Sequence, residues 1–288
     1  MTEREAQSSK PSPGSAGHES ARERIVLQAA DGARAEVYLH GAHVTSWTPA
    51  GADRDALFLS ANADFGDGKA IRGGIPVIFP QFAAEGPLPK HGFARDRAWR
   101  LVAGERPDQA LFELADTPET RAIWNHAFRA ELRVTVSGAA LEVALTVQNT
   151  GDTPFSFTAA LHTYLRVDDI ARTVLRGLRG TRIRDKVAGG DRVEEADELR
   201  IAGEVDRVYL DAPPSLEMVD GERRMTIQSN GFPDTVVWNP GAALAARLAD
   251  LEPGGERRML CVEAAAVGTP VHLEPGARWT GSQTLTAG

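Results

Sequence analysis

The chain has 288 residues, of which 42% are hydrophobic and 25% are charged, a composition typical of a folded protein with a sizeable buried core. Its net charge of -8, without a long block of Lys or Arg, argues against nucleic acid or an anionic membrane as the main partner. An anionic ligand therefore needs a local positive pocket. The single cysteine, Cys261, excludes an intramolecular disulfide framework and favours a cytosolic location.

The N-terminal residues are polar and rich in Ser, Pro and Gly. They offer too little apolar surface to offset the entropy lost on ordering, so we expect residues 1–21 to form a disordered tail. They lack the apolar centre of a secretory signal, and no later run approaches the length of a membrane span. No change of composition suggests a second domain beyond this point, and residues 22–288 are expected to form one domain.

From Arg24 onward the hydrophobic period is mainly two. Residues 131–147 alternate apolar and polar side chains on both sides of Ser137-Gly138, which predicts a β-hairpin. Similar short runs recur to the C-terminal end, separated by turn dipeptides such as Asp31-Gly32 and Asp220-Gly221. The sequence therefore predicts an all-β protein built from antiparallel sheets.

Helical signals are few and short. Residues 119–128 fit one or two turns, and residues 241–254 fit a short helix closed by Pro253-Gly254. Alternating βαβ units are therefore not expected. The simplest architecture is a large antiparallel sandwich whose open face can carry a ligand groove.

Residues 68–99 combine cations with residues that shape loops. Arg72 precedes two glycines, and Lys90, His91 and Arg95 follow within the same segment. Glycines allow the backbone to approach a ligand closely, and guanidinium groups suit phosphate or carboxylate. The segment is a candidate anion site, although both arginines could instead pair with surface acids. The spacing of the glycines does not match a nucleotide P-loop.

His162 belongs to the strand-like run at residues 155–167. Counting by twos places it on the polar face, with Ser156, Thr158 and Tyr164. It could be a solvent-exposed histidine, which is the commoner case for a strand considered alone. It could also be a general acid or base, because imidazole titrates near neutral pH.

Glu263 interrupts a run of small and apolar residues at positions 259–267. A carboxylate in such a run is costly unless it is paired or opens into a cavity. It could form a structural salt bridge with an arginine, or it could be a catalytic carboxylate whose basicity is raised by partial burial.

Metal binding has little support in the sequence. Four histidines could in principle gather on a β scaffold with a glutamate, but no His-x-His or His-Glu-x-x-His motif is present. We expect no metal. The histidines concerned are His43, His91, His126 and His162.

Several of these stretches, taken together and in order, resemble the glucose-6-phosphate 1-epimerases, the hexose-6-phosphate mutarotases of the aldose 1-epimerase superfamily. The resemblance covers roughly residues 24–286. It rests on "YLHGAHVTSW", "LFLS", "DGKAIRGGIPVIFPQF", "LPKHGFARDRAW", "FTAALHTYLRV", "VDRVYL", "VVWNPG", "MLCVEAAAV" and "LEPGARWTGSQTL". It implies a galactose-mutarotase-like β-supersandwich with few short helices. It also implies an enzyme that interconverts the α and β anomers of a hexose 6-phosphate, most simply glucose 6-phosphate, without a cofactor.

The resemblance also implies roles for individual residues. His162 matches the general acid that protonates the ring oxygen, and Glu263 matches the base that deprotonates the anomeric hydroxyl. Both groups are needed, because ring opening moves one proton off the C1 hydroxyl and another onto the ring oxygen.

The remaining matches concern substrate binding. Arg72 and Arg95 are expected to bind the phosphate, Asp206 to accept bonds from sugar hydroxyls, and His91 to lie in the same pocket. Relatives often have glutamine where this chain has Lys90, which could strengthen phosphate binding or alter a sugar contact.

The expected partner is a small sugar phosphate, bound by a monomer. Two alternatives remain at this stage. One is a non-catalytic sugar-phosphate-binding protein, and the other is a mutarotase for an unphosphorylated aldose.

Overall fold

Three antiparallel sheets make up the computed structural model, which describes residues 23–288 except for the side chains of residues 103–105. The predicted tail, residues 1–21, lies outside the described residues. The smallest sheet has the order β1-β2-β3. Its strands are β1 (Arg24–Gln28), β2 (Arg34–Tyr38) and β3 (His43–Thr48).

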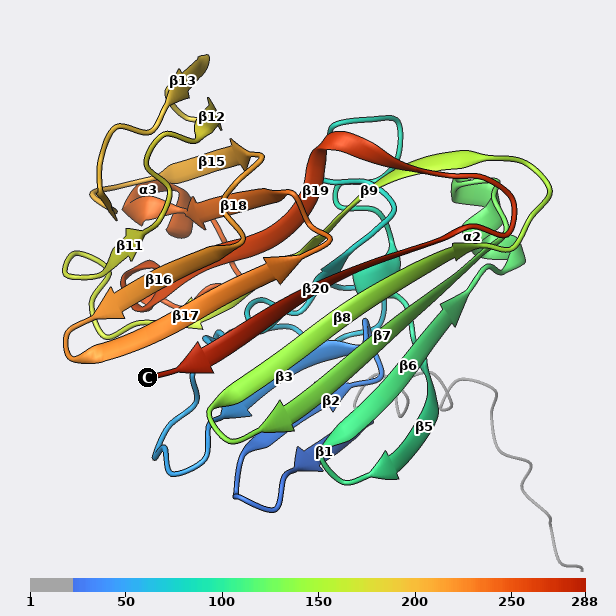
Figure 1. Ribbon diagram of the computed structural model, residues 1–288, viewed down its shortest axis with the longest axis horizontal. Helices are drawn as coiled ribbons and strands as arrows, with labels where there is room; N and C mark the ends of the chain where they lie inside the picture. Colours follow the sequence, from blue (N-terminus) through green and yellow to red (C-terminus); the bar gives the residue numbers. More distant parts are fainter. Residues whose placement is uncertain (1–22) are drawn as a thin grey trace, which may run out of the picture.

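The largest sheet has nine strands in the order β14-β11-β16-β17-β20-β8-β7-β6-β5, several of which run side by side in Figure 1. In that order the strands are β14 (Glu198–Arg200), β11 (Val174–Arg176), β16 (Ser215–Asp220), β17 (Arg223–Asn230), β20 (Arg278–Ala287), β8 (Ala140–Asn149), β7 (Phe128–Ser137), β6 (Gln109–Ala115) and β5 (Arg100–Arg106).

The third sheet has eight strands, with β13-β12-β15-β18-β19-β9-β4 in order and β10 paired to β19. This sheet carries the residues of greatest interest. Its strands are β13 (Asp191–Val193), β12 (Arg182–Asp185), β15 (Val205–Leu210), β18 (Asp234–Asn239), β19 (Met259–Leu273), β9 (Phe155–Leu161), β4 (Val77–Ile78) and β10 (Tyr164–Arg166).

The hairpin predicted at residues 131–147 is confirmed. β7 and β8 pair antiparallel from Phe128↔Asn149 to Ser137↔Ala140, and Gly138 in the turn has a φ of 54°, a value that glycine adopts readily. Exposure alternates along both strands. The period of two was therefore a correct guide to which side chains face the core.

The short helices agree only in part with the prediction. α2 (Pro118–Ile123) is capped by Thr117 and lies where a helix was expected. α3 covers only Gly241–Ala245, so the prediction that Pro253-Gly254 closes this helix was wrong. Beyond Ala245 the chain continues in tight turns, which bring Asp250 against Arg72.

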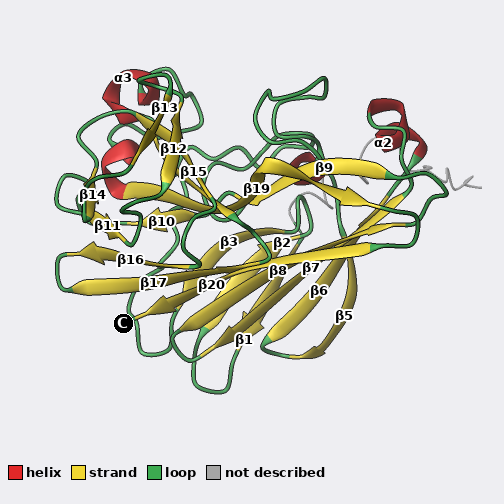
Figure 2. Cartoon of the chain, turned by 45° about the horizontal axis from the view of Figure 1, so that its top comes forward, coloured by secondary structure: helices red, strands yellow, loops and turns green. Residues whose placement is uncertain are grey.

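A hydrophobic core lies between the sheets and draws on all three of them. It includes Trp47 from β3, Leu145 from β8 and Val262 from β19, each at most 1% exposed. Figure 2 shows the nine-stranded sheet lying along one side of the molecule, with β9, β19 and β15 in the layer above it. The predicted sandwich of antiparallel sheets with few short helices is confirmed.

The eight-stranded sheet is covered on both faces. Val262, Ala264 and Ala266 of β19 point into the main core, whereas Ala265 and Val267 pack in a second cluster on the outer face. Phe82, from the loop after β4, belongs to that outer cluster. Loops thus cover the outer face of the sheet. Because β19 is buried on both faces, its residues at positions 259–267 are almost all apolar rather than alternating with polar ones.

Candidate active site

Glu263 occupies the outer face of β19. It pairs with Val236 of β18, and its neighbours Val262 and Ala264 point the other way, into the core. On β9 the Leu161↔Ala264 pair brings the next residue, His162, beside Glu263. Strand alternation thus places an acid and a base together on the face away from the main core.

The backbone turns aside at His162, between β9 and β10. The His162 N–H donates to the Pro76 carbonyl at 3.0 Å. The hydroxyl of Thr163 donates to Gln283 Oε1 of β20 at 2.5 Å, and Gln283 in turn donates to the Val262 carbonyl. These buried hydrogen bonds fix the position of the segment around His162 relative to β20 of the nine-stranded sheet.

The His162 and Glu263 side chains form a close, buried pair. Nε2 of His162 lies 3.3 Å from Oε1 of Glu263, and the two residues are 8% and 1% exposed. The solvent-exposed alternative for His162 is therefore wrong. His162 Nδ1 and Glu263 Oε2 have no hydrogen-bond partner, and orphaned buried polar atoms cost about 1–3 kcal/mol each. Each side chain of the pair therefore keeps one polar atom without a hydrogen-bond partner within the described part of the protein.

Burial shifts the pKa of both groups, in opposite directions. The pKa of Glu263 is raised well above its ordinary value of 4.5, first by burial and then by Asp206. The pKa of His162 is lowered well below 6.5 by burial, and then by His91, Arg95 and Arg72. Both shifts favour the uncharged form of each group, a neutral imidazole beside a protonated carboxyl.

Arg72 sits on a loop whose shape depends on two glycines. Gly73 has a φ of 113° and Gly74 one of 62°, and an added Cβ would lie 2.4 Å from the Phe58 carbonyl oxygen or 2.2 Å from that of Val44. No other residue fits either position without a backbone shift.

Two buried histidines hold this loop from below. His40 Nε2 bonds the Lys69 carbonyl at 2.6 Å, and His43 Nε2 bonds the Gly73 carbonyl at 2.7 Å. Burial lowers the pKa of His43 to about 3, so its ring is neutral and donates through Nε2. These contacts give the histidines of "LHGAH" a structural role, since they fix both ends of the loop that carries Arg72.

The guanidinium of Arg72 is largely occupied within the protein. Nε and Nη2 reach Asp250 Oδ2 at 3.2 and 3.0 Å, and Nη1 donates to the Tyr164 hydroxyl at 2.9 Å. The pairing with an acid that the sequence also allowed is therefore present at Arg72, and its binding of a ligand stays a prediction. These contacts orient the planar group of Arg72 toward Tyr164.

Arg95, from the 3-10 turn η1 (Ala94–Asp96), is less completely paired. Its Nη2 donates to the Lys90 carbonyl at 3.3 Å, while its buried Nε has no hydrogen-bond partner and lies 3.7 Å from Asp96. Burial lowers the pKa of Arg95. A cation that has lost water without gaining full pairing is well placed to receive an anion.

His91 lies beside His162, with ring centroids 5.8 Å apart. It adopts a φ of 67°, and its Nδ1 accepts the Ala83 N–H at 3.3 Å. Its pKa is lowered to about 3 by burial and by the cations around it. The neutral ring therefore carries its proton on Nε2 and is a hydrogen-bond donor there.

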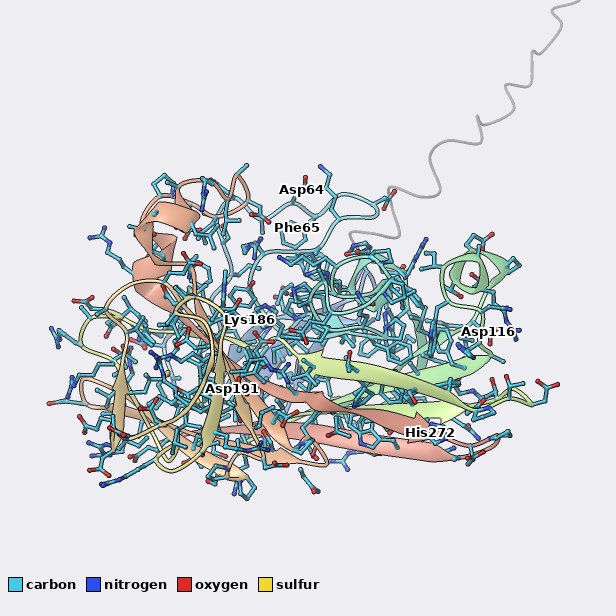
Figure 3. All side chains as sticks on the ribbon, turned by 90° about the horizontal axis from the view of Figure 1, so that it is seen from above. Asp64, Phe65, Asp116, Lys186, Asp191 and His272 are labelled. Carbon is cyan, nitrogen blue, oxygen red and sulfur yellow. The ribbon has the colours of Figure 1, made fainter. Side chains whose placement is uncertain are left out.

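Asp206, on β15, faces a lysine that the sequence did not single out. Burial raises the pKa of Asp206, while Lys186 and Lys90 lower it. Lys186 follows β12, pairs with Glu85 at 2.7 Å and lies 4.6 Å from the centre of the Phe82 ring. Figure 3 places Lys186 near the middle of the molecule, away from Asp116 and His272.

One cavity of about 510 Å³ gathers all the predicted site residues. A second cavity of about 350 Å³ adjoins it, and Arg72, Arg95 and Tyr164 line both. The predicted residues that line the first are Arg72, Lys90, His91, Arg95, His162, Asp206 and Glu263. Their common location is a geometric fact, whereas their individual roles remain predictions.

Among the described residues, no cluster of three or more His, Cys, Asp or Glu side chains could hold a metal ion. His43 and His126 lie outside the lining of the large cavity. In the same described part of the chain, no helix is long and apolar enough to cross a membrane.

Residues 23–286 match the family model described as aldose 1-epimerase. The chain belongs to the aldose 1-epimerase family. A relative from Cenchrus ciliaris, named "Putative glucose-6-phosphate 1-epimerase", is 39% identical over 92% of this chain and 84% of its own length. Membership makes the protein an isomerase of the epimerase class.

Two solved structures show the same fold. A crystal structure of a "putative mutarotase" from Salmonella typhimurium superposes with a TM-score of 0.82 at 33% identity, covering 88% of this chain and 87% of that one. A galactose mutarotase-like protein from Lactobacillus casei superposes with a TM-score of 0.72 at 16% identity, covering 92% of this chain and 100% of that one. At this identity the similarity supports the fold alone. The galactose-mutarotase-like architecture expected from the sequence is confirmed.

The cavity of this epimerase family member also contains residues that sequence reasoning missed, among them Tyr164, Trp238 and Lys186. Tyr164 and Trp238 contact His162 through their rings, and Lys186 faces Asp206. Tyr164 could have been found, because it shares the polar face of its strand with His162. Lys186 follows a short strand in a charged turn, and nothing in its sequence context distinguishes it from a solvated lysine.

The buried carboxyl gives a prediction about stability. The pKa of Glu263 is higher in the folded than in the unfolded chain. The stabilising contribution of its protonated carboxyl to the free energy of unfolding is therefore fully present below pH 4.5, and it is lost as pH rises through the folded pKa. Glu263→Gln should therefore gain stability over the wild type as pH rises from 4.5, by about 1.4 kcal/mol per pH unit until the folded pKa is reached. Urea unfolding from pH 4 to 8 measures the difference, and an equal difference at every pH would contradict it.

Proposed function

We propose that the protein interconverts the α and β anomers of a hexose 6-phosphate, with glucose 6-phosphate as the first candidate. The main support for this proposal is that His162 and Glu263, an acid–base pair, line the same cavity as the incompletely paired guanidinium of Arg95. The name of the Cenchrus ciliaris relative, glucose-6-phosphate 1-epimerase, supports the same substrate class. Family membership supports the reaction itself.

In the proposed mechanism the Glu263 carboxylate accepts the proton of the C1 hydroxyl. As the C1–O5 bond breaks, His162 gives a proton to the ring oxygen, which yields the open-chain aldehyde. Rotation about C1–C2 presents the other aldehyde face, and the same transfers in reverse close the ring. Each positioned acid or base typically contributes about 10²- to 10⁴-fold, and no further group is required.

This cycle requires the titrating proton to start on His162, whereas the pKa shifts of the two groups in the empty site favour Glu263 as its carrier. The 3.3 Å contact between Nε2 and Oε1 allows the proton to pass between the two residues. Arg95 and Arg72 both lower the pKa of His162. A bound phosphate would neutralise these cations, raise the pKa of His162 and so favour the reactive form.

Arg95→Ala tests the substrate class. The ratio of kcat/KM for glucose 6-phosphate to that for glucose should fall by about 10- to 100-fold, the effect of one lost charge-assisted pair. Anomer exchange is followed by NMR saturation transfer. Arg100→Ala is the control, because this exposed arginine pairs with Glu113 and lies outside the lining of the cavity. If the wild-type protein shows no preference for glucose 6-phosphate over glucose, the substrate is an unphosphorylated aldose. If it binds the sugar phosphate without accelerating anomer exchange, the protein is a non-catalytic sugar-phosphate-binding protein.

We further propose that the chain acts as a monomer in the cytosol. All the residues in the mechanism come from one chain and one cavity, so no second copy is needed to complete the site. Sedimentation velocity and cell fractionation test these two statements.

A further inference from the structure

We propose that Tyr164 determines phosphate specificity, its hydroxyl binding the phosphate of the substrate while its ring holds the imidazole of His162 in place. One side chain would then join the phosphate end of the site to the acid that acts at the ring oxygen. This inference rests on the proposed function.

The first observation is the position of Tyr164 between two cavities. The 510 Å³ cavity contains the acid–base pair, and the adjoining 350 Å³ cavity contains Lys69 and Asp250. The residues common to both are Arg72, Arg95 and Tyr164. A phosphate that contacts the Arg72 guanidinium would lie close to the tyrosine hydroxyl, which is 2.9 Å from Nη1 of Arg72.

The second observation is that this hydroxyl still has a proton to donate. It accepts a hydrogen bond from Arg72 Nη1 at 2.9 Å, and among the described residues none accepts the proton of the phenol itself. Burial raises the pKa of Tyr164, so the proton is retained at neutral pH. A phenol donates one hydrogen bond besides those it accepts, and the arginine that contacts it makes phosphate the acceptor of matching charge.

The third observation is the contact between the rings of Tyr164 and His162. They are stacked, with centroids 4.8 Å apart and planes 10° from parallel, and Trp238 meets both edge-on. Contacts of this kind fix the plane of the imidazole. Tyr164 thus bears on the orientation of the acid without taking part in proton transfer.

The backbone ties this tyrosine to the loop of Arg72. The Tyr164 N–H donates to the Gly74 carbonyl at 2.9 Å, and its own carbonyl accepts from the Phe58 N–H at 2.9 Å. Gly74 lies two residues after Arg72. The donor at Tyr164 and the guanidinium at Arg72 therefore keep a fixed spacing.

Two substitutions separate the role of the hydroxyl from that of the ring. Tyr164→Phe keeps the ring, so we expect the ratio of kcat/KM for glucose 6-phosphate to that for glucose to fall about tenfold, mainly through KM. The inhibition constant of inorganic phosphate should weaken by a similar factor. Tyr164→Leu should in addition lower kcat for both sugars, because the imidazole loses its stacked partner.

Tyr38→Phe is the matched control. Its hydroxyl also accepts a bond from an arginine, Arg24, at 3.4 Å, but it lies outside both cavities, and the ratio should not change. A Tyr164→Phe enzyme whose ratio and phosphate inhibition match the wild type would overturn the inference. A wild type that shows no preference for glucose 6-phosphate would instead overturn the proposed function, so the two failures are distinguishable.

Discussion

Glu263→Gln is expected to slow anomer exchange by about 10²- to 10⁴-fold, the contribution of one positioned general base. Glutamine keeps the volume of the side chain at a position that is only 1% exposed, but its amide cannot accept and hold the proton of the C1 hydroxyl. The loss should appear in kcat, because the step that fails is the chemical one.

The measurement is NMR saturation transfer between the two anomers of glucose 6-phosphate. Glu204→Gln is a suitable control, since Glu204 lines the same cavity but is exposed, and its rate should stay close to that of the wild type. If the folded Glu263→Gln protein retained the wild-type rate, Glu263 could not be the base.

His162→Ala is expected to cause a loss of similar size, about 10²- to 10⁴-fold. The variant lacks the proposed general acid for the ring oxygen, and the carboxyl of Glu263 loses the partner that lies 3.3 Å away. Added imidazole should restore part of the rate, because the substitution leaves a space of the right size beside Tyr164 and Trp238.

The double variant gives a stricter test. Because the two residues act as a unit, His162→Ala with Glu263→Gln should be little slower than the slower single variant. Losses that multiply would show that the groups act independently, and would contradict transfer of a shared proton between them.

Local patterns predicted most of the sheet structure. The alternation in residues 131–147 gave the β7–β8 hairpin because one face of each strand packs on the core and the other faces out. The same counting placed His162 on the correct side of its strand but not at the correct depth, since loops distant in sequence cover that face. Exposure depends on those loops and cannot be derived from the strand alone.

The remaining differences arise from contacts between distant parts of the chain. After α3 the chain turns and places Asp250 against Arg72, and a propensity argument confined to residues 241–254 contains no information about that ion pair. Lys186 enters the cavity through the pairing of β12 with β15, which brings a charged turn beside Asp206. The resemblance to a family supplied the convergence of seven residues on one cavity, which spacing alone would not have predicted.

The division between strands and loops in this cavity has an evolutionary consequence. Glu263 and Asp206 lie on strands, and His162 lies between two strands of the same sheet, whereas Arg72, Lys90 and Lys186 come from connecting segments. Insertions and substitutions accumulate more readily in connections than in paired strands. A lineage can therefore exchange the groups that select a substituent on the sugar while it inherits the proton-transfer machinery unaltered.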